Sequence, residues 1–222
     1  MTAVRQAVRM VSFDMDGTLI RGTTASLFMA ERLGNLAAVQ ELERRFDTGE
    51  ITAATFADAV AHSHLDLLYV DLCRHFDRLP LIAGIAETVA ALRRRGIICV
   101  IATVSYAFYA RVLAERFAFD GHCGAEMHEL DGKLTGRMAR HIDADGKRAF
   151  VEGTARRHGI AMRDVAHVGD SLSDLPTFAA VGKAIAINAT ANARAAAHHA
   201  LDTDNLCEVL PLLGFPAANG AA

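Results

Sequence analysis

Residues Val11–Ile20 read VSFDMDGTLI, an apolar run of strand length that ends in two aspartates one residue apart. Aspartate is uncommon in strands and costly to bury, so two like charges directly after a buried strand indicate a special site. Gly17 and Thr18 follow at once, and a glycine lets the backbone turn sharply and approach a ligand closely. In open α/β sheets, ligands bind beyond the carboxyl ends of the strands. The stretch therefore predicts a first strand that carries Asp14 and Asp16 into a binding site.

The composition is that of an ordinary globular protein. The 222 residues are 52% apolar and 22% charged, which allows one core of fair size. A net charge of −3 and a pI near 6.4 give no field that would attract nucleic acid. No apolar run reaches the roughly 18 residues of a membrane span, and the start of the chain lacks a signal-peptide pattern. We expect neither nucleic acid nor a membrane as a partner.

The cysteines give no sign of a disulfide framework or a zinc site. Cys73, Cys99, Cys123 and Cys207 are far apart in sequence, and none belongs to a CxxC pair. We therefore expect a reduced, cytoplasmic protein.

Short apolar runs separated by helical patterns indicate the fold class. Nearly all-apolar strands that alternate with helices are typical of a parallel sheet covered on both faces. We expect an α/β fold with a doubly wound, Rossmann-like parallel sheet. The expected strands are Val8–Phe13, Ile97–Val104, Val165–Val168 and Ala184–Ile187, and expected core helices are Ile85–Arg95 and Lys147–His158.

Residues 23–79 break this rhythm, because they show helical patterns and no convincing strand. They are too long for one crossover helix, so we interpret them as an inserted α-helical cap. Residues 1–22 and 80–216 then form the α/β core, and 217–222 a disordered tail. An Asp-Gly pair between alternating residues predicts a hairpin over Met127–Met138. The expected cap helices are Thr24–Leu33, Leu36–Phe46, Ala53–His62 and Leu67–Phe76.

Polar side chains stand where the expected strands end, and these ends meet at one edge of a parallel sheet. Clustered carboxylates repel each other unless a cation lies between them. Ligand sets of oxygen alone favour a hard ion, and Mg²⁺ suits a site where a substrate phosphate supplies a further oxygen. A carboxylate beside the metal can attack phosphorus, while a hydroxyl and a lysine can hold phosphate oxygens. The set consists of Asp14, Asp16, Thr103, Ser105, Lys147, Asp170 and Asp174.

This set resembles the four motifs of the haloacid dehalogenase superfamily: DMDGT at 14–18, Ser105, Lys147 and GDSLSD at 169–174. Within that superfamily the chain is similar to the phosphoserine phosphatase branch, which also has a helical cap after the first motif and DGKLTG before the lysine, here at 131–136. The resemblance implies a Mg²⁺-dependent phosphatase that acts on a small phosphate ester through an aspartyl-phosphate intermediate.

The resemblance also implies a role for each acid. Asp14 is similar to the nucleophile that becomes phosphorylated. Asp16 resembles the general acid, later the base that activates water, and its backbone carbonyl would bind Mg²⁺. Asp170 is similar to the third protein ligand of the metal. Asp174 resembles the acid behind it, which orients metal-bound water or the lysine.

Two hydroxyls compete for the second motif. Thr103 and Ser105 point to the same side of an extended chain, so either could face the phosphate. The family pattern of a serine followed by two glycines favours Ser105, although Tyr106 and Ala107 stand in place of the glycines. Together with Lys147, this hydroxyl is expected to bind the phosphate oxygens.

The expected substrate differs from that of the branch. Phosphoserine phosphatases read the substrate's amino group with a glutamate soon after the first motif, and its carboxylate with a cap arginine. Here Thr23 occupies the first position, and the corresponding cap helix has no arginine. We expect phosphoserine to be a poor substrate, and a neutral or hydroxyl-rich leaving group to be met by Thr23, Thr24 or His62.

Alternatives remain open at this point. Arg21, or the pair Arg44 and Arg45, could substitute for the missing cap arginine, which would leave a phosphoserine phosphatase proper. A phosphotransferase would use the same aspartyl-phosphate with an acceptor other than water. A catalytically silent ligand-binding module is the alternative that is not an enzyme.

Overall fold

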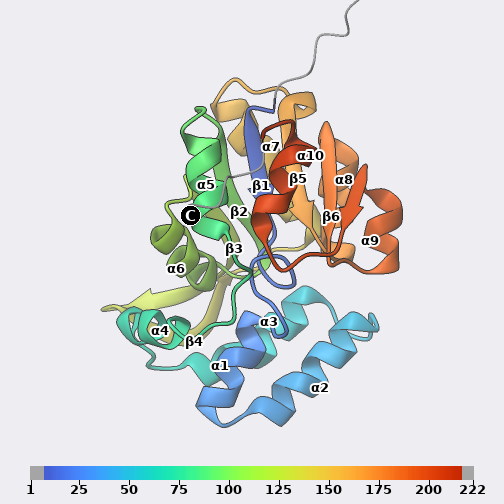
Figure 1. The fold of residues 1–222 in the computed structure, drawn as a ribbon. Helices are drawn as coiled ribbons and strands as arrows, with labels where there is room; N and C mark the ends of the chain where they lie inside the picture. The colour runs from blue at the N-terminus through green and yellow to red at the C-terminus, as the bar shows by residue number, and fades with distance from the viewer. Residues whose placement is uncertain (1–7, 217–222) are drawn as a thin grey trace, which may run out of the picture.

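The computed structural model describes residues 8–216, so the predicted tail at 217–222 lies outside the described residues. One seven-stranded sheet has the order β4-β3-β2-β1-β5-β6-β7 (Figure 1). Neighbouring strands are parallel except for β3 and β4. The α/β doubly wound fold class is confirmed. The strands are β1 Met10–Phe13, β2 Ile98–Tyr106, β3 Gly121–Leu130, β4 Lys133–Arg140, β5 Val165–Gly169, β6 Lys183–Ile187 and β7 His199–Leu201.

Strand β1 lies between β2 and β5, and all four of its residues are buried. Its last residue, Phe13, is in register with Ile101 of β2 and Val168 of β5. The backbone N–H of Asp14 then donates to the carbonyl of Val168 at 2.8 Å. The first aspartate is therefore fixed at the carboxyl end of the sheet by the ladder itself.

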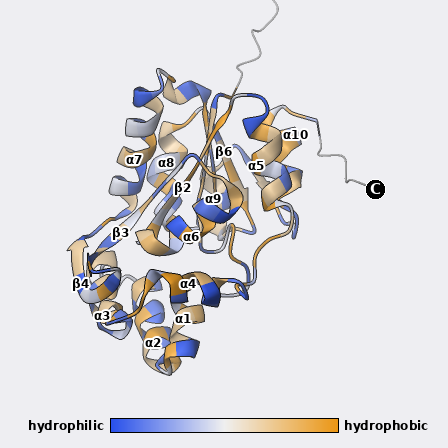
Figure 2. Cartoon of the chain, turned by 90° about the vertical axis from the view of Figure 1, so that its left-hand side faces the viewer, coloured by the Kyte–Doolittle hydropathy of each residue, from blue (hydrophilic) through white to orange (hydrophobic). Residues whose placement is uncertain are grey.

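Helices cover both faces of the sheet. Helices α7 and α8 lie on one side of the strands, and α5 and α10 lie on the other (Figure 2). Helix α7 begins earlier than predicted, because the Asp143 side chain caps it by accepting from the N–H of Gly146 at 2.8 Å. Lys147 thus lies inside the helix and not at its start. The core helices are α5 Ile85–Arg93, α6 Ala107–Phe117, α7 Ala144–Arg157, α8 Leu175–Ala180, α9 Ala191–Ala196 and α10 Val209–Leu213.

Four helices gather beyond the carboxyl end of β1 (Figure 1). Each helix predicted for this region is present, with ends that differ by one or two residues. Thr24 caps the first of them, because its hydroxyl accepts from the N–H of Leu27 at 3.1 Å. They are α1 Ala25–Leu33, α2 Leu36–Asp47, α3 Ala53–Ala61 and α4 Tyr69–Phe76, with a 3₁₀ turn η1 at His62–His64.

Aromatic side chains of the core hold these helices in place. The Tyr106 hydroxyl donates to the carbonyl of Ala57 in α3 at 2.7 Å. His64 Nε2 lies 2.5 Å from the Tyr109 hydroxyl, while its Nδ1 lies 3.2 Å from the carbonyl of Val60. Burial lowers the pKa of His64 to about 4, so a neutral ring donates to Val60 and accepts from Tyr109. Both contacts are buried, which makes them costly to break.

The predicted hairpin is present as β3 and β4, joined by Asp131 and Gly132 with φ of 50° and 77°. These values fit the two-residue turn that an Asp-Gly pair favours. The first half of β3 was not predicted, and it pairs in parallel with β2. Gly124 permits this approach, because a Cβ there would overlap the backbone at Ser105 and Ala107.

Gly124→Ala should lower the free energy of unfolding by about 1–3 kcal/mol, because the added methyl would overlap backbone atoms that cannot rotate away. Thermal and denaturant unfolding measure the change. Gly121→Ala in the same strand is the matched control, since its Cβ would meet only Val100 Cγ1, at an ordinary 3.7 Å. Equal stability of the two variants would contradict the close approach at Gly124.

Candidate active site

The two aspartates of the first motif leave β1 at the carboxyl end of the sheet. Asp14 is 4% exposed. Asp16 Oδ1 accepts from the backbone N–H of Ala25, the first residue of α1, at 2.6 Å, so the positive end of this helix dipole faces the carboxylate. Gly17 turns the chain with φ of 79°, and a Cβ at this position would overlap the carboxylate of Asp170. A glycine is therefore required where the first motif meets the last.

Lys147 places a positive charge among these acids. Its side chain is fully buried, and Nζ donates to Asp14 Oδ1 at 2.6 Å and to Asp174 Oδ1 at 2.5 Å. Burial alone would lower the pKa of Lys147, but the two carboxylates raise it above its ordinary value. The lysine is therefore a cation, and the pairing offsets the desolvation of three charged groups.

Four donors surround the Asp174 carboxylate. Oδ1 accepts from Lys147 and from His167 Nε2, the latter at 2.8 Å. Oδ2 accepts from the backbone N–H groups of Asp170 and Ser171, at 2.9 and 3.0 Å. Burial would raise the pKa of Asp174, but Lys147 and His167 lower it below its ordinary value. Both oxygens are thus occupied by the protein.

Asp170, in contrast, has one carboxylate oxygen that is available to a ligand. Its Oδ1 is buried and finds no hydrogen-bond partner within the described part of the chain. Carboxylate oxygens of Asp14, Asp170 and Asp174 lie within 4.8 Å of one another. Burial, together with the charges of Asp14 and Asp174, raises the pKa of Asp170 to about 9. This arrangement fits a hard divalent cation, with Asp14 and Asp170 as the carboxylates open to it.

The second aspartate and the second-motif serine lie together. Burial raises the pKa of Asp16 to about 7, and the charges of Asp14 and Glu43 add to the rise, while hydrogen bonds from Ala25 and Ser105 oppose it. A carboxyl with this pKa exchanges a proton near neutral pH.

Of the two candidate hydroxyls, Ser105 is the one beside the acids. Its side chain hydrogen-bonds Asp16. Thr103 is 1% exposed, and its hydroxyl accepts from the backbone N–H of Ser105 at 3.1 Å. The Thr103 hydroxyl is therefore engaged by the backbone of β2, and this geometry favours Ser105 as the group that meets a ligand.

The comparison with protein families agrees with this arrangement of motifs. Residues 11–179 match the model of the haloacid dehalogenase-like hydrolases. The chain belongs to this family. No helix within residues 8–216 of this haloacid dehalogenase-like hydrolase is both long and apolar enough to span a bilayer.

Several similar proteins carry the name phosphoserine phosphatase. The protein from Archaeoglobus fulgidus is 30% identical over 94% of this chain and 61% of its own length. Phosphoserine phosphatase SerB2 of Mycobacterium tuberculosis is 30% identical over 93% of this chain and 50% of its own length. The chain thus spans between half and three-fifths of these relatives. A solved structure of a phospho-aspartyl intermediate analogue of phosphoserine phosphatase shares the fold, with a TM-score of 0.80, 22% identity, and coverage of 93% of this chain and 99% of that one.

The residues predicted to meet the leaving group differ in their surroundings. The Thr24 hydroxyl is already committed, since it caps α1 and donates to Glu43 Oε1 at 2.5 Å. The Thr23 hydroxyl donates to the carbonyl of Thr24 at 3.3 Å. His62 is exposed, and within residues 8–216 no hydrogen bond or ion pair joins it to the acids. The structure therefore does not bring His62 into the cluster.

Two residues near the acids were not predicted. Glu43 lies on α2, and burial raises its pKa to about 7. Its helix carries exposed charges on neighbouring positions such as Glu41 and Arg44, so no local pattern distinguishes it. His167, which contacts Asp174, stands inside the apolar run of β5. A histidine in a fully buried strand was the signal that could have identified it.

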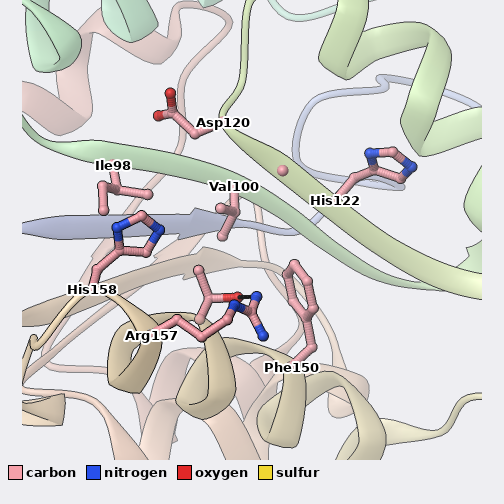
Figure 3. A pocket seen from close by; sticks show the side chains of 9 residues that line it. Ile98, Val100, Asp120, His122, Phe150, Arg157 and His158 are labelled. Carbon is pink, nitrogen blue, oxygen red and sulfur yellow. Dashed lines mark hydrogen bonds between the residues drawn. The ribbon is translucent and has the colours of Figure 1, made fainter.

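A separate hollow of about 380 Å³ lies between α7 and the first residues of β2 and β3 (Figure 3). Three of its polar side chains are engaged by the protein itself. Asp120 accepts from the N–H of Cys99 at 2.8 Å and pairs with Arg93 at 3.2 Å. Arg157 donates to the Thr154 hydroxyl at 2.8 Å. None of the clustered acids lines this hollow, so the chemistry is not located there.

Without a divalent cation, the protein should lose stability as the pH rises from about 7 to about 9. A carboxyl whose pKa is raised by folding binds its proton more tightly in the folded state, so stability falls as the pH climbs from the ordinary pKa to the raised one. For Asp170 that window runs from 3.8 to about 9. Above pH 7, the stability that comes from the lowered pKa values of His64 and Asp174 is fully present and no longer changes with pH. Denaturant unfolding across this range measures the fall.

Mg²⁺ should restore stability more at the alkaline end, because a cation binds the ionised carboxylates of the folded state. Asp170→Asn should flatten the fall. Asp131→Asn is the matched control, since Asp131 is an exposed residue of the hairpin turn. A metal-free wild type whose stability rises over this range would contradict the prediction.

Proposed function

We propose that this chain is a phosphoric monoester hydrolase that acts on a small organic phosphate through an aspartyl-phosphate at Asp14. The observation that carries the proposal is the fully buried Nζ of Lys147, 2.6 Å from Asp14 Oδ1. A cation held there reduces the repulsion between an attacking carboxylate and an anionic phosphate. Membership of the hydrolase family and the names of the relatives support the same class of reaction.

The reaction has two steps. Asp14 attacks phosphorus in line, and the bond from phosphorus to the leaving oxygen breaks as Asp16 gives that oxygen its proton. Water then attacks the phosphorus of the aspartyl-phosphate while Asp16, now a carboxylate, takes its proton. Inorganic phosphate and free Asp14 are released. The pKa of about 7 suits Asp16 to both roles. Ser105 and Lys147 hold the phosphate oxygens throughout.

We propose Mg²⁺ as the cofactor, held by the carboxylates of Asp14 and Asp170 and by the backbone carbonyl of Asp16. Bound Mg²⁺ would supply positive charge beside the phosphate. The fit is supported by the unpartnered Oδ1 of Asp170 and by a donor set of oxygen alone. Asp174, with both oxygens hydrogen-bonded, holds Lys147 and the turn after β5 and is not a ligand.

We further propose that residues 23–79 act as a cap over a core of residues 1–22 and 80–216. The hydrogen bond between Asp16 and Ala25 supports this division, because it ties the general acid directly to the first cap helix. A closed cap would exclude bulk water while the leaving group departs and would select that group.

The partner in this proposal is a small phosphate ester, and the location is the cytoplasm. All four cysteines are free thiols, which is typical of a reducing compartment.

Asp14→Asn should abolish turnover and leave the fold intact, because an amide matches the shape of the carboxylate but cannot attack phosphorus. The measurement is the release of inorganic phosphate from an aryl phosphate with Mg²⁺, beside circular dichroism of the same samples. Asp131→Asn should behave as wild type. If Asp14→Asn kept about a tenth of wild-type kcat/KM, the nucleophile assignment would be wrong. Transfer of phosphate to an added alcohol, with none released to water, would indicate a phosphotransferase.

The surroundings of Asp16 favour a leaving group that carries hydroxyl or amino groups and no carboxylate. Glu43, whose charge acts on Asp16, is an acceptor for such donors. Of the three arginines that could bind a carboxylate, two are engaged at the surface, while Arg21 lies beside the first motif and its Nε has no hydrogen-bond partner within the described residues. Arg44 and Arg45 pair with Glu50 at the surface, and Arg21 donates to a backbone carbonyl of the first motif at 2.7 Å. We therefore propose that phosphoserine is a poor substrate, with a phosphoserine phosphatase proper as the alternative that the relatives' names favour.

The measurement is kcat/KM for phosphoserine, an amino-alcohol phosphate, a polyol phosphate and an aryl phosphate. Lack of a clamp on a desolvated carboxylate costs roughly 2–5 kcal/mol, so kcat/KM for phosphoserine should lie at least about 30-fold below that of the best substrate. Glu43→Gln should lower kcat/KM for the amino-alcohol and polyol esters and spare the aryl ester. Glu41→Gln, exposed on the same helix, is the matched control. Phosphoserine as the best substrate would restore the alternative.

A further inference from the structure

His167 lies behind the cluster of acids and touches no position open to a substrate. It stands on β5 in register with Ser12 of β1, and both side chains are fully buried. Nδ1 lies 3.1 Å from the Ser12 hydroxyl, and Nε2 lies 2.8 Å from Asp174 Oδ1. The ring also meets the Phe178 ring edge-on, with centroids 5.5 Å apart. Its position and its orientation are therefore both determined.

The chemistry of the two partners determines which atom donates in each contact of His167. Asp174 is an anion that can only accept, so the Nε2–H of His167 donates to it. In the neutral ring Nδ1 then accepts from the Ser12 hydroxyl, which keeps the proton on Nε2. A buried imidazole is costly unless its nitrogens are bonded. The other residues of β5 are apolar or glycine, so the strand accommodates this side chain where an apolar one would pack as well.

A chain of contacts leads from this ring to the proposed nucleophile. The oxygen of Asp174 that accepts from His167 also accepts from Lys147 Nζ at 2.5 Å. The same Nζ donates to Asp14 at 2.6 Å. A shift of the Asp174 carboxylate therefore moves the ammonium group away from Asp14 or toward it.

We propose that His167 is a positioning residue, which holds the Asp174 carboxylate in the one rotamer that sets Lys147 against Asp14. The proposal rests on the function proposed above. His167 acts through Asp174 and meets neither phosphate nor leaving group. Outer partners of this kind typically contribute about 10- to 100-fold to activity.

The test compares three variants of the full chain with Mg²⁺ and an aryl phosphate. His167→Leu removes the donor, and kcat should fall about 10- to 100-fold with little change in KM. His167→Gln places an amide N–H where Nε2 stands, so it should recover most of that loss. His167→Asn is equally polar but reaches only toward Ser12, so it should resemble His167→Leu. If the leucine variant does not fold, the pair of amide variants decides.

A matched control separates this role from simple packing. Thr177 is fully buried, and its hydroxyl has no hydrogen-bond partner within the described residues, so Thr177→Val should leave kcat unchanged. Wild-type kcat in His167→Leu, or equal losses in His167→Gln and His167→Asn at equal folded fraction, would overturn the proposal.

The hydrogen bond can also be observed without turnover. A slowly exchanging imidazole N–H resonance assigned to His167 should be present in the wild-type NMR spectrum and absent from that of His167→Gln, while the resonance of the buried His64 ring stays in both. Its absence from the wild type would overturn the role of His167 even if phosphatase activity is found. A wild type without phosphatase activity but with this resonance would overturn the proposed function, and with it the catalytic purpose of the positioning.

Discussion

The buried ammonium group of Lys147 determines how the acidic residues around it can be buried. Carboxylates from the ends of β1 and β5 lie within a few ångströms of it, in a region that excludes water. Such a group of anions is stable only when a cation and hydrogen bonds compensate for lost hydration. Because the lysine comes from α7, this helix must pack where it does for the acids to be buried. The packing of the core and the geometry of the site therefore depend on each other.

Burial, together with the negative charge that one lysine does not neutralise, raises the pKa values of Asp16 and Asp170. The two acids differ in their hydrogen bonds. Asp170 keeps an unpartnered oxygen, which suits it to a metal ion. Asp16 accepts the first N–H of α1, and its pKa of about 7 suits it to proton transfer. Asp174 has four donors and stays anionic. The same residue type therefore serves three purposes according to its hydrogen bonds.

The helices of residues 23–79 are joined to these acids at the start of α1. The N-terminus of α1 meets Asp16 through Ala25 and Glu43 through Thr24. The buried contact of His64 with Tyr109 holds the 3₁₀ turn η1 against α6. Any movement of these helices would change the surroundings of Asp16.

Local patterns in the sequence were enough to predict the class of fold, the four central strands and the helices of residues 23–79, because apolar periodicity and caps act over a few residues. The acids and the two hydroxyls were found in the same way, since strand ends of a parallel sheet converge, whereas Lys147 was found at the expected start of a helix. The first half of β3 was missed, because Gly124 has a meaning only where β2 passes close to it. The sequence by itself thus determined the class of fold and the places along the chain of these chemical groups. Tertiary structure alone decided which oxygen of Asp170 stays free, why Ser105 and not Thr103 faces Asp16, and that Glu43 and His167 belong to the site. The physical reason is that hydrogen-bond partners and pKa values depend on neighbours that are distant in sequence.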